Sequence, residues 1–181
     1  MRITDTRARP YVCDNVHTRR FNEIIDMMNT HGYDSPALMF GERAPFEKDI
    51  CKTMEIDLDC TDFDLDCQFP EMPQYNTLFC CELIEHLLNP LWFLRQAREL
   101  MTDDSYMYVT YPIQPHRYWS PIHFHEYDRS RFLYLLRDAK LDVVDYKEFV
   151  WWKPIKGIRP IIRNTPIGWR KQQIYVLKRG L

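Results

Sequence analysis

Two small groups of carboxylate and imidazole side chains are the residues of this sequence best suited to chemistry. Glu82, Glu85 and His86 fall within one short acidic turn. Further along the chain, His123 and His125 are separated by a single aromatic residue. Carboxyl groups and imidazoles placed in a pocket can give and take protons near neutral pH, so either group could supply a general acid or a general base.

His86, His123 and His125 are the candidate catalytic residues, because each offers an imidazole that can accept a proton. If the second segment is extended, His123 and His125 point to the same side. His116 or Glu126 could then complete a metal site, but no second spaced pair of ligands supports one, and we predict no metal. A structural role for His86, as a cap or hydrogen-bond partner at a helix entrance, is the competing interpretation.

The segment around the first group has the pattern of a strand, an acidic turn and a helix. Residues 76–81 are apolar enough for a buried strand. Asn89-Pro90 is a strong helix start, since the Asn89 side chain can cap free N–H groups and the first helical position, where Pro90 stands, requires no N–H donor. One apolar helical face follows, formed by Leu91, Leu94, Ala97 and Met101. Ligands of open α/β sheets bind beyond the carboxyl ends of strands, so Glu82 would border a ligand crevice.

The rest of the chain alternates between helical and strand patterns. We expect a first helix that stops at Gly32, a short helix at 44–52 and a helix capped by Asp128. Strands are expected at 36–41, 53–57, 106–111, 141–150 and 173–177, with a turn at 102–105. This order predicts a three-layer α/β fold with a mostly parallel sheet. The last strand has no helix before it and should therefore pair antiparallel.

A length of 181 residues predicts one domain, spanning residues 1–181. A basic N-terminal arm at 1–14 and loop insertions at 112–127 and 151–170 would surround its core. The sequence contains no apolar run near the roughly 18–20 residues of a transmembrane helix, and its start shows no secretory pattern. We therefore expect a cytoplasmic protein without a membrane partner, in which the six cysteines are reduced.

The net charge of −2 hides an uneven distribution. Residues 42–104 hold fifteen acidic and five basic side chains, whereas residues 149–181 hold eight basic side chains and no acidic one. The acidic loop at 57–66 is expected to be solvated. The two segments could neutralise each other on one surface, or the basic segment could contact an anionic substrate or a nucleic acid.

Three stretches together resemble a known family. Asp64 to Pro70, Tyr75 to Pro90 and Phe93 to Met101 are similar to the class I S-adenosylmethionine-dependent methyltransferases. The resemblance is to the small-molecule subgroup with an E-x-x-E-H-L-x-x-P motif after the fourth strand. Residues 123–141 resemble that family's loop and last helix, so the similarity covers about residues 55–145.

The resemblance implies a Rossmann-like methyltransferase fold, either complete or reduced, and S-adenosylmethionine as the cofactor. It also implies which positions would bind that cofactor: Gly41, Glu42, Asp57 or Asp59, Cys81, Glu82 and His86. In the family an acidic residue that ends the second strand holds the ribose hydroxyls, and here Asp57 and Asp59 are both candidates. The acceptor would be a small molecule or a sugar-containing intermediate.

The glycine-rich turn of that family is degenerate in this sequence. Gly41 is kept, but Glu42 and Arg43 stand where small residues are usual, and Ala44-Pro45 replaces the next glycine. Side chains in this turn can occupy space that a cofactor needs. Two functions therefore stay open: methyl transfer, in which alignment of the reactants dominates, and a catalytically inactive methyltransferase-like domain that acts as a binding or scaffolding protein.

Overall fold

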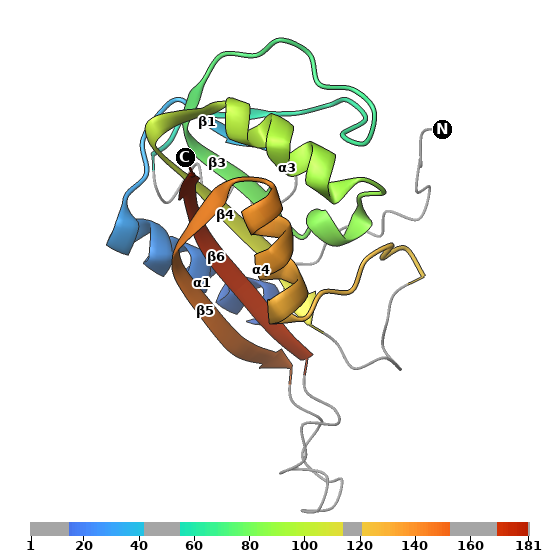
Figure 1. Ribbon diagram of the computed structural model, residues 1–181. Helices are drawn as coiled ribbons and strands as arrows, with labels where there is room; N and C mark the ends of the chain where they lie inside the picture. The colour runs from blue at the N-terminus through green and yellow to red at the C-terminus, as the bar shows by residue number, and fades with distance from the viewer. Residues whose placement is uncertain (1–14, 42–54, 114–120, 153–169, 181) are drawn as a thin grey trace, which may run out of the picture.

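The computed structural model describes residues 15–41, 55–113, 121–152 and 170–180, and the structural statements below refer to these residues. Their elements follow one another along the chain as shown in Figure 1. In order they are α1 (Asn15–His31), β1 (Ala37–Met39), β2 (Leu58–Cys60), β3 (Tyr75–Cys81), the short 3-10 helix η1 (Ile84–His86), α3 (Pro90–Glu99), β4 (Met101–Ile113), α4 (Arg129–Asp138), β5 (Leu141–Trp152) and β6 (Arg170–Arg179).

The strands form one six-stranded sheet in the order β2-β1-β3-β4-β6-β5. Strands β2, β1, β3 and β4 run parallel to one another, whereas β6 pairs antiparallel with both β4 and β5. The predicted mostly parallel sheet with an antiparallel C-terminal strand is therefore confirmed. Because β1, β2 and β3 run the same way, their carboxyl ends meet at one edge of the sheet.

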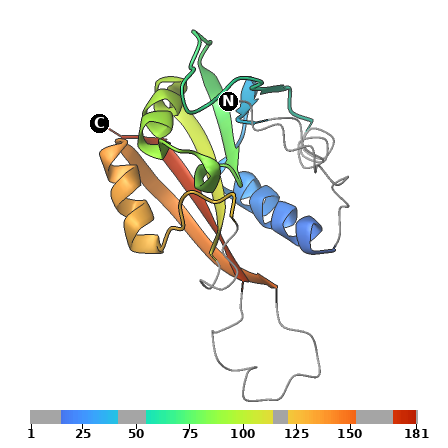
Figure 2. The ribbon, with the colours of Figure 1, turned by 90° about the vertical axis from the view of Figure 1, so that its right-hand side faces the viewer.

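The sheet lies between helix α1 on one face and helices α3 and α4 on the other, which is the predicted three-layer arrangement (Figures 1 and 2). The α1 face is apolar and includes Phe21, Ile24, Met28, Phe79 and Tyr108. The opposite face includes Leu78, Phe93, Leu94, Phe132 and Tyr175. Cys80 and Cys81 point to opposite faces, as the alternation along a strand requires. The four cysteines of the described segments are free thiols.

Two sequence predictions about strands were wrong. The second strand is Leu58–Cys60 rather than 53–57, and within the described residues Glu55 has a positive φ of 51° that no strand allows. Residues 102–105 are not a separate turn but part of the long strand β4. The pairing of β3 with β4 is nevertheless irregular there, because Tyr75 pairs with Met101 and Thr77 already pairs with Tyr106. Residues 102–105 of β4 thus lie opposite the single residue Asn76 of β3, and they form a bulge.

Several predicted segments lie wholly or partly outside the described residues. These are the arm at 1–14, the short helix at 44–52, residues 114–120 of the first loop insertion and residues 153–169 of the second. At the margins, residues 112–113 belong to β4, and residues 151–152 and 170 belong to β5 and β6. In the described part of the chain, no helix is long and apolar enough to cross a membrane.

The entrance to α3 is held by two side chains. The side-chain oxygen Oδ1 of Asn89 accepts from the Trp92 N–H at 3.3 Å, which confirms the predicted N-cap. Asp66, from the acidic loop, accepts from the backbone N–H groups of Leu88 at 2.7 Å and Asn89 at 2.9 Å. One carboxylate oxygen therefore fixes the segment that leads from η1 into α3.

We expect Asp66→Ala to lower the free energy of unfolding by about 1 kcal/mol, because two N–H donors lose their acceptor and water replaces it only in part. The matched control is Asp62→Ala. Asp62 is exposed in the same loop, and its substitution should stay within about 0.5 kcal/mol of wild type. Urea denaturation of the three proteins measures the difference. Equal losses in both variants would contradict the bridging role of Asp66.

Candidate functional site

The candidate site begins where β3 ends. Glu82 has a positive φ of 53°, a conformation in which the chain turns sharply. Its N–H donates to the Thr110 carbonyl oxygen at 3.0 Å, which extends the pairing of β3 with β4 by one residue. The turn leads directly into η1, so that Glu85 and His86 project at the carboxyl end of the central strand.

The Glu82 carboxylate is held by three elements of the fold. One oxygen forms an ion pair with the Arg20 guanidinium of α1. The other accepts from the Thr110 hydroxyl of β4 at 3.0 Å and from the Gln172 amide of β6. The sequence pointed to Glu82 as a cofactor-binding residue, whereas the structure shows its side chain engaged with protein groups.

Glu85 is a buried carboxyl group. Its side chain is 3% exposed, and its Oε2 atom has no hydrogen-bond partner among the described residues. Burial, followed by the charge of Glu82, raises its pKa well above the usual range. The backbone carbonyl of Glu85 accepts from the N–H groups of Phe124 at 2.8 Å and His125 at 3.2 Å. The loop after β4 is thereby fixed over η1.

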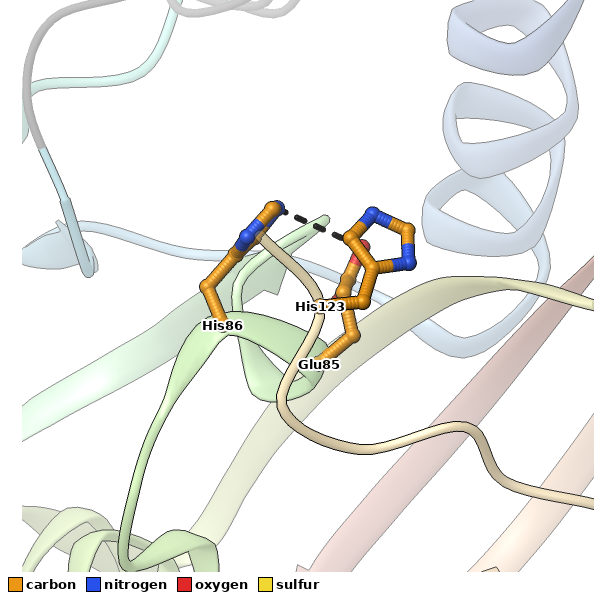
Figure 3. A group of neighbouring side chains, drawn as sticks. All are labelled: Glu85, His86 and His123. Atoms are coloured by element: carbon orange, nitrogen blue, oxygen red, sulfur yellow. Dashed lines mark ion pairs between the residues drawn. The ribbon is translucent and has the colours of Figure 1, made fainter. Parts of the chain in front are cut away.

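This loop brings His123 against His86. The two rings meet edge to face with their centroids 4.8 Å apart, and Figure 3 shows them converging with Glu85. His86 Nδ1 lies 3.0 Å from the Ile122 carbonyl oxygen, and its Nε2 lies 3.9 Å from Glu85 Oε1. Burial lowers the pKa of His86. Two of the three predicted histidines thus share one site.

His123 has its own carboxylate partner. Its Nδ1 lies 3.0 Å from Glu126 Oε1, and both side chains are largely buried. The third predicted histidine, His125, lies outside this cluster. Its ring stacks on Tyr127 at a centroid distance of 5.7 Å, and its Nε2 is 3.5 Å from the Leu88 carbonyl oxygen.

The second part of the site is the turn after β1. Gly41 has a φ of 107°, which side chains of L-residues rarely tolerate, and its N–H donates to the Thr61 hydroxyl at 2.8 Å. No described atom lies within 4 Å of the position that a Cβ would occupy. Gly41 therefore presents open backbone at the carboxyl end of β1. The neighbouring candidate Glu42 lies outside the described residues.

The two candidate ribose ligands do not lie at this edge of the sheet. Asp57 precedes β2 and is therefore at the end opposite to Glu82, and Asp59 accepts from the Tyr75 hydroxyl at 3.0 Å. Asp62 is the acidic residue that follows β2, and it is exposed. The sequence reasoning did not consider Asp62 for this position because it placed the second strand too early. The alternation Ile56-Asp57-Leu58-Asp59, with its apolar members buried, was the available signal.

Cys81, the remaining candidate, ends β3 on the α1 face. Its thiol neighbours Thr110 and Glu82, and burial raises its pKa to about 12. The thiol is therefore protonated at neutral pH and is not an activated nucleophile. Cys81 can contribute packing or a backbone group at this edge of the sheet.

Comparisons with known proteins identify solved structures with a similar fold. No protein-family model and no curated protein matches the sequence. An S-adenosylmethionine-dependent methyltransferase from Archaeoglobus fulgidus has a TM-score of 0.63 at 12% identity, covering 89% of this chain and 94% of its own. The N-methyltransferase NodS from Bradyrhizobium japonicum, in complex with S-adenosyl-L-homocysteine, has a TM-score of 0.60 at 9% identity, covering 91% and 89%. The cyclase SpnF has a TM-score of 0.57 at 11% identity, covering 88% and 82%.

These similarities show that the chain has the Rossmann-like fold of the class I methyltransferases. At such low identities they show the fold alone. A cyclase among the neighbours illustrates that one fold can carry different chemistry, so an activity has to be argued from the residues of the site.

The contacts of Glu82 predict a stability effect. We expect Glu82→Gln to lower the free energy of unfolding by about 1–3 kcal/mol, because hydrogen bonds to a charged group are weakened and the Arg20 guanidinium loses this carboxylate partner. Urea denaturation in the absence of ligands measures this loss. Hydrogen exchange should also become faster in α1, which the Arg20 ion pair connects to the sheet edge.

Glu99→Gln is the control, since Glu99 forms exposed ion pairs with Arg98 and Arg179. Exposed pairs contribute less than about 1 kcal/mol. A loss in Glu82→Gln no larger than that in Glu99→Gln would show that the Glu82 contacts do not hold α1 in place.

Proposed function

We propose that this protein transfers a methyl group from S-adenosylmethionine to a small-molecule acceptor. The open backbone at Gly41 carries the proposal. This glycine lies at the carboxyl end of β1, where open α/β sheets bind their ligands, and a Cβ there would meet no described atom. The described residues thus leave space at this turn for a cofactor to approach the backbone.

Two of the predicted cofactor positions, Gly41 and His86, support this proposal, and a third is replaced by a neighbouring residue. Gly41 would contact the cofactor through its backbone, and Asp62 would take the place of Asp57 or Asp59 as acceptor of the ribose hydroxyls. His86 borders the same edge from η1. Glu42 stays a prediction, and Cys81 and Glu82 would contribute through their backbone, because the Glu82 side chain is already engaged.

S-adenosylmethionine, when bound, supplies a methyl group on a sulfonium that is already a good leaving group, so the protein mainly has to orient the reactants. A hydroxyl or ammonium acceptor must also lose a proton. His86 and His123 each have their Nδ1 next to a backbone carbonyl or a carboxylate, which leaves Nε2 to receive that proton.

The surroundings of the histidines favour an acceptor with an apolar part. Leu88, Ile122 and Phe124 are 63%, 53% and 49% exposed, although they are large hydrophobic side chains. Leu88 follows η1, and the other two flank His123 in the loop. Such a group of exposed apolar side chains beside buried polar groups is typical of small-molecule sites. A cytoplasmic location remains a prediction from the sequence.

A nucleic-acid acceptor receives less support from the described part of the basic segment. Lys171 pairs with Glu148 at 2.5 Å, and Arg179 pairs with Glu99 at 3.0 Å. These bases are therefore neutralised by acidic side chains of the same chain. Residues 153–169 lie outside the described part.

The alternative function is a methyltransferase-like domain that binds a partner without transferring a methyl group. The observation that favours it is the Glu82 carboxylate, which is engaged by Arg20, Thr110 and Gln172. Together with the single glycine in the turn after β1, this leaves fewer groups for the cofactor.

Isothermal titration with S-adenosylhomocysteine, alongside thermal shifts with S-adenosylmethionine, separates the two functions. A ligand that binds the folded state alone stabilises it by about 2.7 kcal/mol at a hundredfold excess over Kd. We expect Asp62→Ala to weaken binding by about 10- to 100-fold, since hydrogen bonds to a carboxylate contribute about 1.5–3 kcal/mol. Asp57→Ala, at the opposite end of β2, should leave the affinity unchanged.

Absence of any shift at millimolar ligand, with the protein folded, would rule out the methyltransferase and leave the binding domain. Equal losses in Asp57→Ala and Asp62→Ala would show that the cofactor lies elsewhere. Unfolding free energies of both variants without ligand provide the control for folding.

A further inference from the structure

Glu85, His86 and His123 form a cluster that the proposed methyl transfer does not fully explain. Each residue offers one ligand atom, and these atoms lie within 4.8 Å of one another. Figure 3 shows that η1 supplies two of the side chains and the loop after β4 supplies the third. The sequence did not predict this grouping, because Glu85 and His123 are far apart in the chain and only the fold brings them together.

The Nδ1 atoms of both imidazoles have oxygen partners, as those of metal-binding histidines commonly do. His86 Nδ1 faces the Ile122 carbonyl oxygen at 3.0 Å, and His123 Nδ1 faces Glu126 Oε1 at 3.0 Å. Each Nδ1 can donate its proton to that oxygen, which leaves the lone pair on Nε2. Histidines that bind metals commonly donate their other N–H to a carbonyl or carboxylate in this way.

The carboxyl group supplies the second, independent observation. Glu85 is 3% exposed, and its Oε2 atom has no hydrogen-bond partner among the described residues. A buried carboxyl oxygen without a hydrogen-bond partner is costly. Glu82 and Glu126 place further negative charge near it. Arg20 offsets this in part, but it pairs with Glu82. A cation beside Glu85 would satisfy the free oxygen and oppose the remaining negative charge.

We propose that Glu85, His86 and His123 bind one divalent transition-metal ion, with Glu126 as the residue that orients His123. Two imidazoles and one carboxylate, with further positions open, suit Zn²⁺, Fe²⁺ or Mn²⁺ better than Mg²⁺, which prefers oxygen ligands. Bonds of about 2.0–2.1 Å require ligand atoms about 3–3.5 Å apart. The three side chains therefore have to move inward by little more than an ångström.

This site goes beyond the proposed methyl transfer and does not depend on it. A bound ion would use both Nε2 atoms, so that neither histidine could act as a base at the same time. The open positions of the ion could instead hold an oxygen ligand and lower its pKa. The ligand class is thus a small molecule with a hydroxyl or carboxylate oxygen beside the apolar group of Leu88, Ile122 and Phe124.

The test is titration of the untagged full-length protein, stripped with a chelator, with Zn²⁺ and Co²⁺. We expect one saturable site, with Co²⁺ developing visible absorption bands that report a low-coordinate nitrogen and oxygen environment. Mg²⁺ at the same concentrations should not compete. Glu85→Gln and His123→Gln should weaken Zn²⁺ binding at least tenfold. Glu126→Gln should weaken it about tenfold, as losses of outer-shell partners usually do.

His31→Gln is the matched control, because His31 Nε2 also faces a carboxylate, Asp145 Oδ2 at 2.7 Å, but on the other side of the fold. Its substitution should leave the affinity unchanged. Circular dichroism and thermal unfolding of the metal-free variants show that they fold, and Glu85→Gln keeps the size of the buried side chain. Absence of saturable binding to wild type, or equal affinity in wild type, Glu85→Gln and His123→Gln, would overturn the proposal.

Discussion

The architecture of the site depends on one partly buried contact, the Glu82 carboxylate with Arg20, Thr110 and Gln172. These partners come from α1, β4 and β6, so the contact joins one helical layer to two strands of the sheet. Removing a single partner from such a group leaves a charge or donor without compensation. The same residue has a positive φ, and the chain can then turn at once into η1. The side chain of Glu82 thus connects α1 to the sheet, and its backbone conformation sets the direction of the turn.

From this turn the site is assembled by backbone groups as much as by side chains. The Glu85 carbonyl accepts two N–H groups of the loop after β4, and the Ile122 carbonyl faces His86. The loop is thereby positioned without a regular element of its own. Asp66 fixes the other side of η1 by accepting the N–H groups of Leu88 and Asn89. Within the acidic loop at 57–66, Asp66 therefore has a structural task that the sequence did not predict.

The sequence predicted most of the fold, because its strongest signals are local. The Asn89-Pro90 helix start, the Asp128 cap and the apolar strand before Glu82 all depend on neighbouring residues. The second strand was misplaced since β2 has three residues and gains its order from pairing with β1. The site was predicted less well. The approach of His123 to Glu85 and the capture of Glu82 by Gln172 are long-range contacts, for which residue spacing carries no signal.

The carboxyl edge of the sheet therefore has two parts, which depend on different properties of the chain. At Gly41 the decisive property is backbone conformation and open space among the described residues, whereas at Glu85 it is a buried carboxyl group with one oxygen that lacks a hydrogen-bond partner there. A change in the turn after β1 would leave the carboxylate and histidines in place, because Glu82 and the loop after β4 hold them independently. Cofactor binding and metal binding can be present or absent separately in this fold, and the fold by itself determines neither.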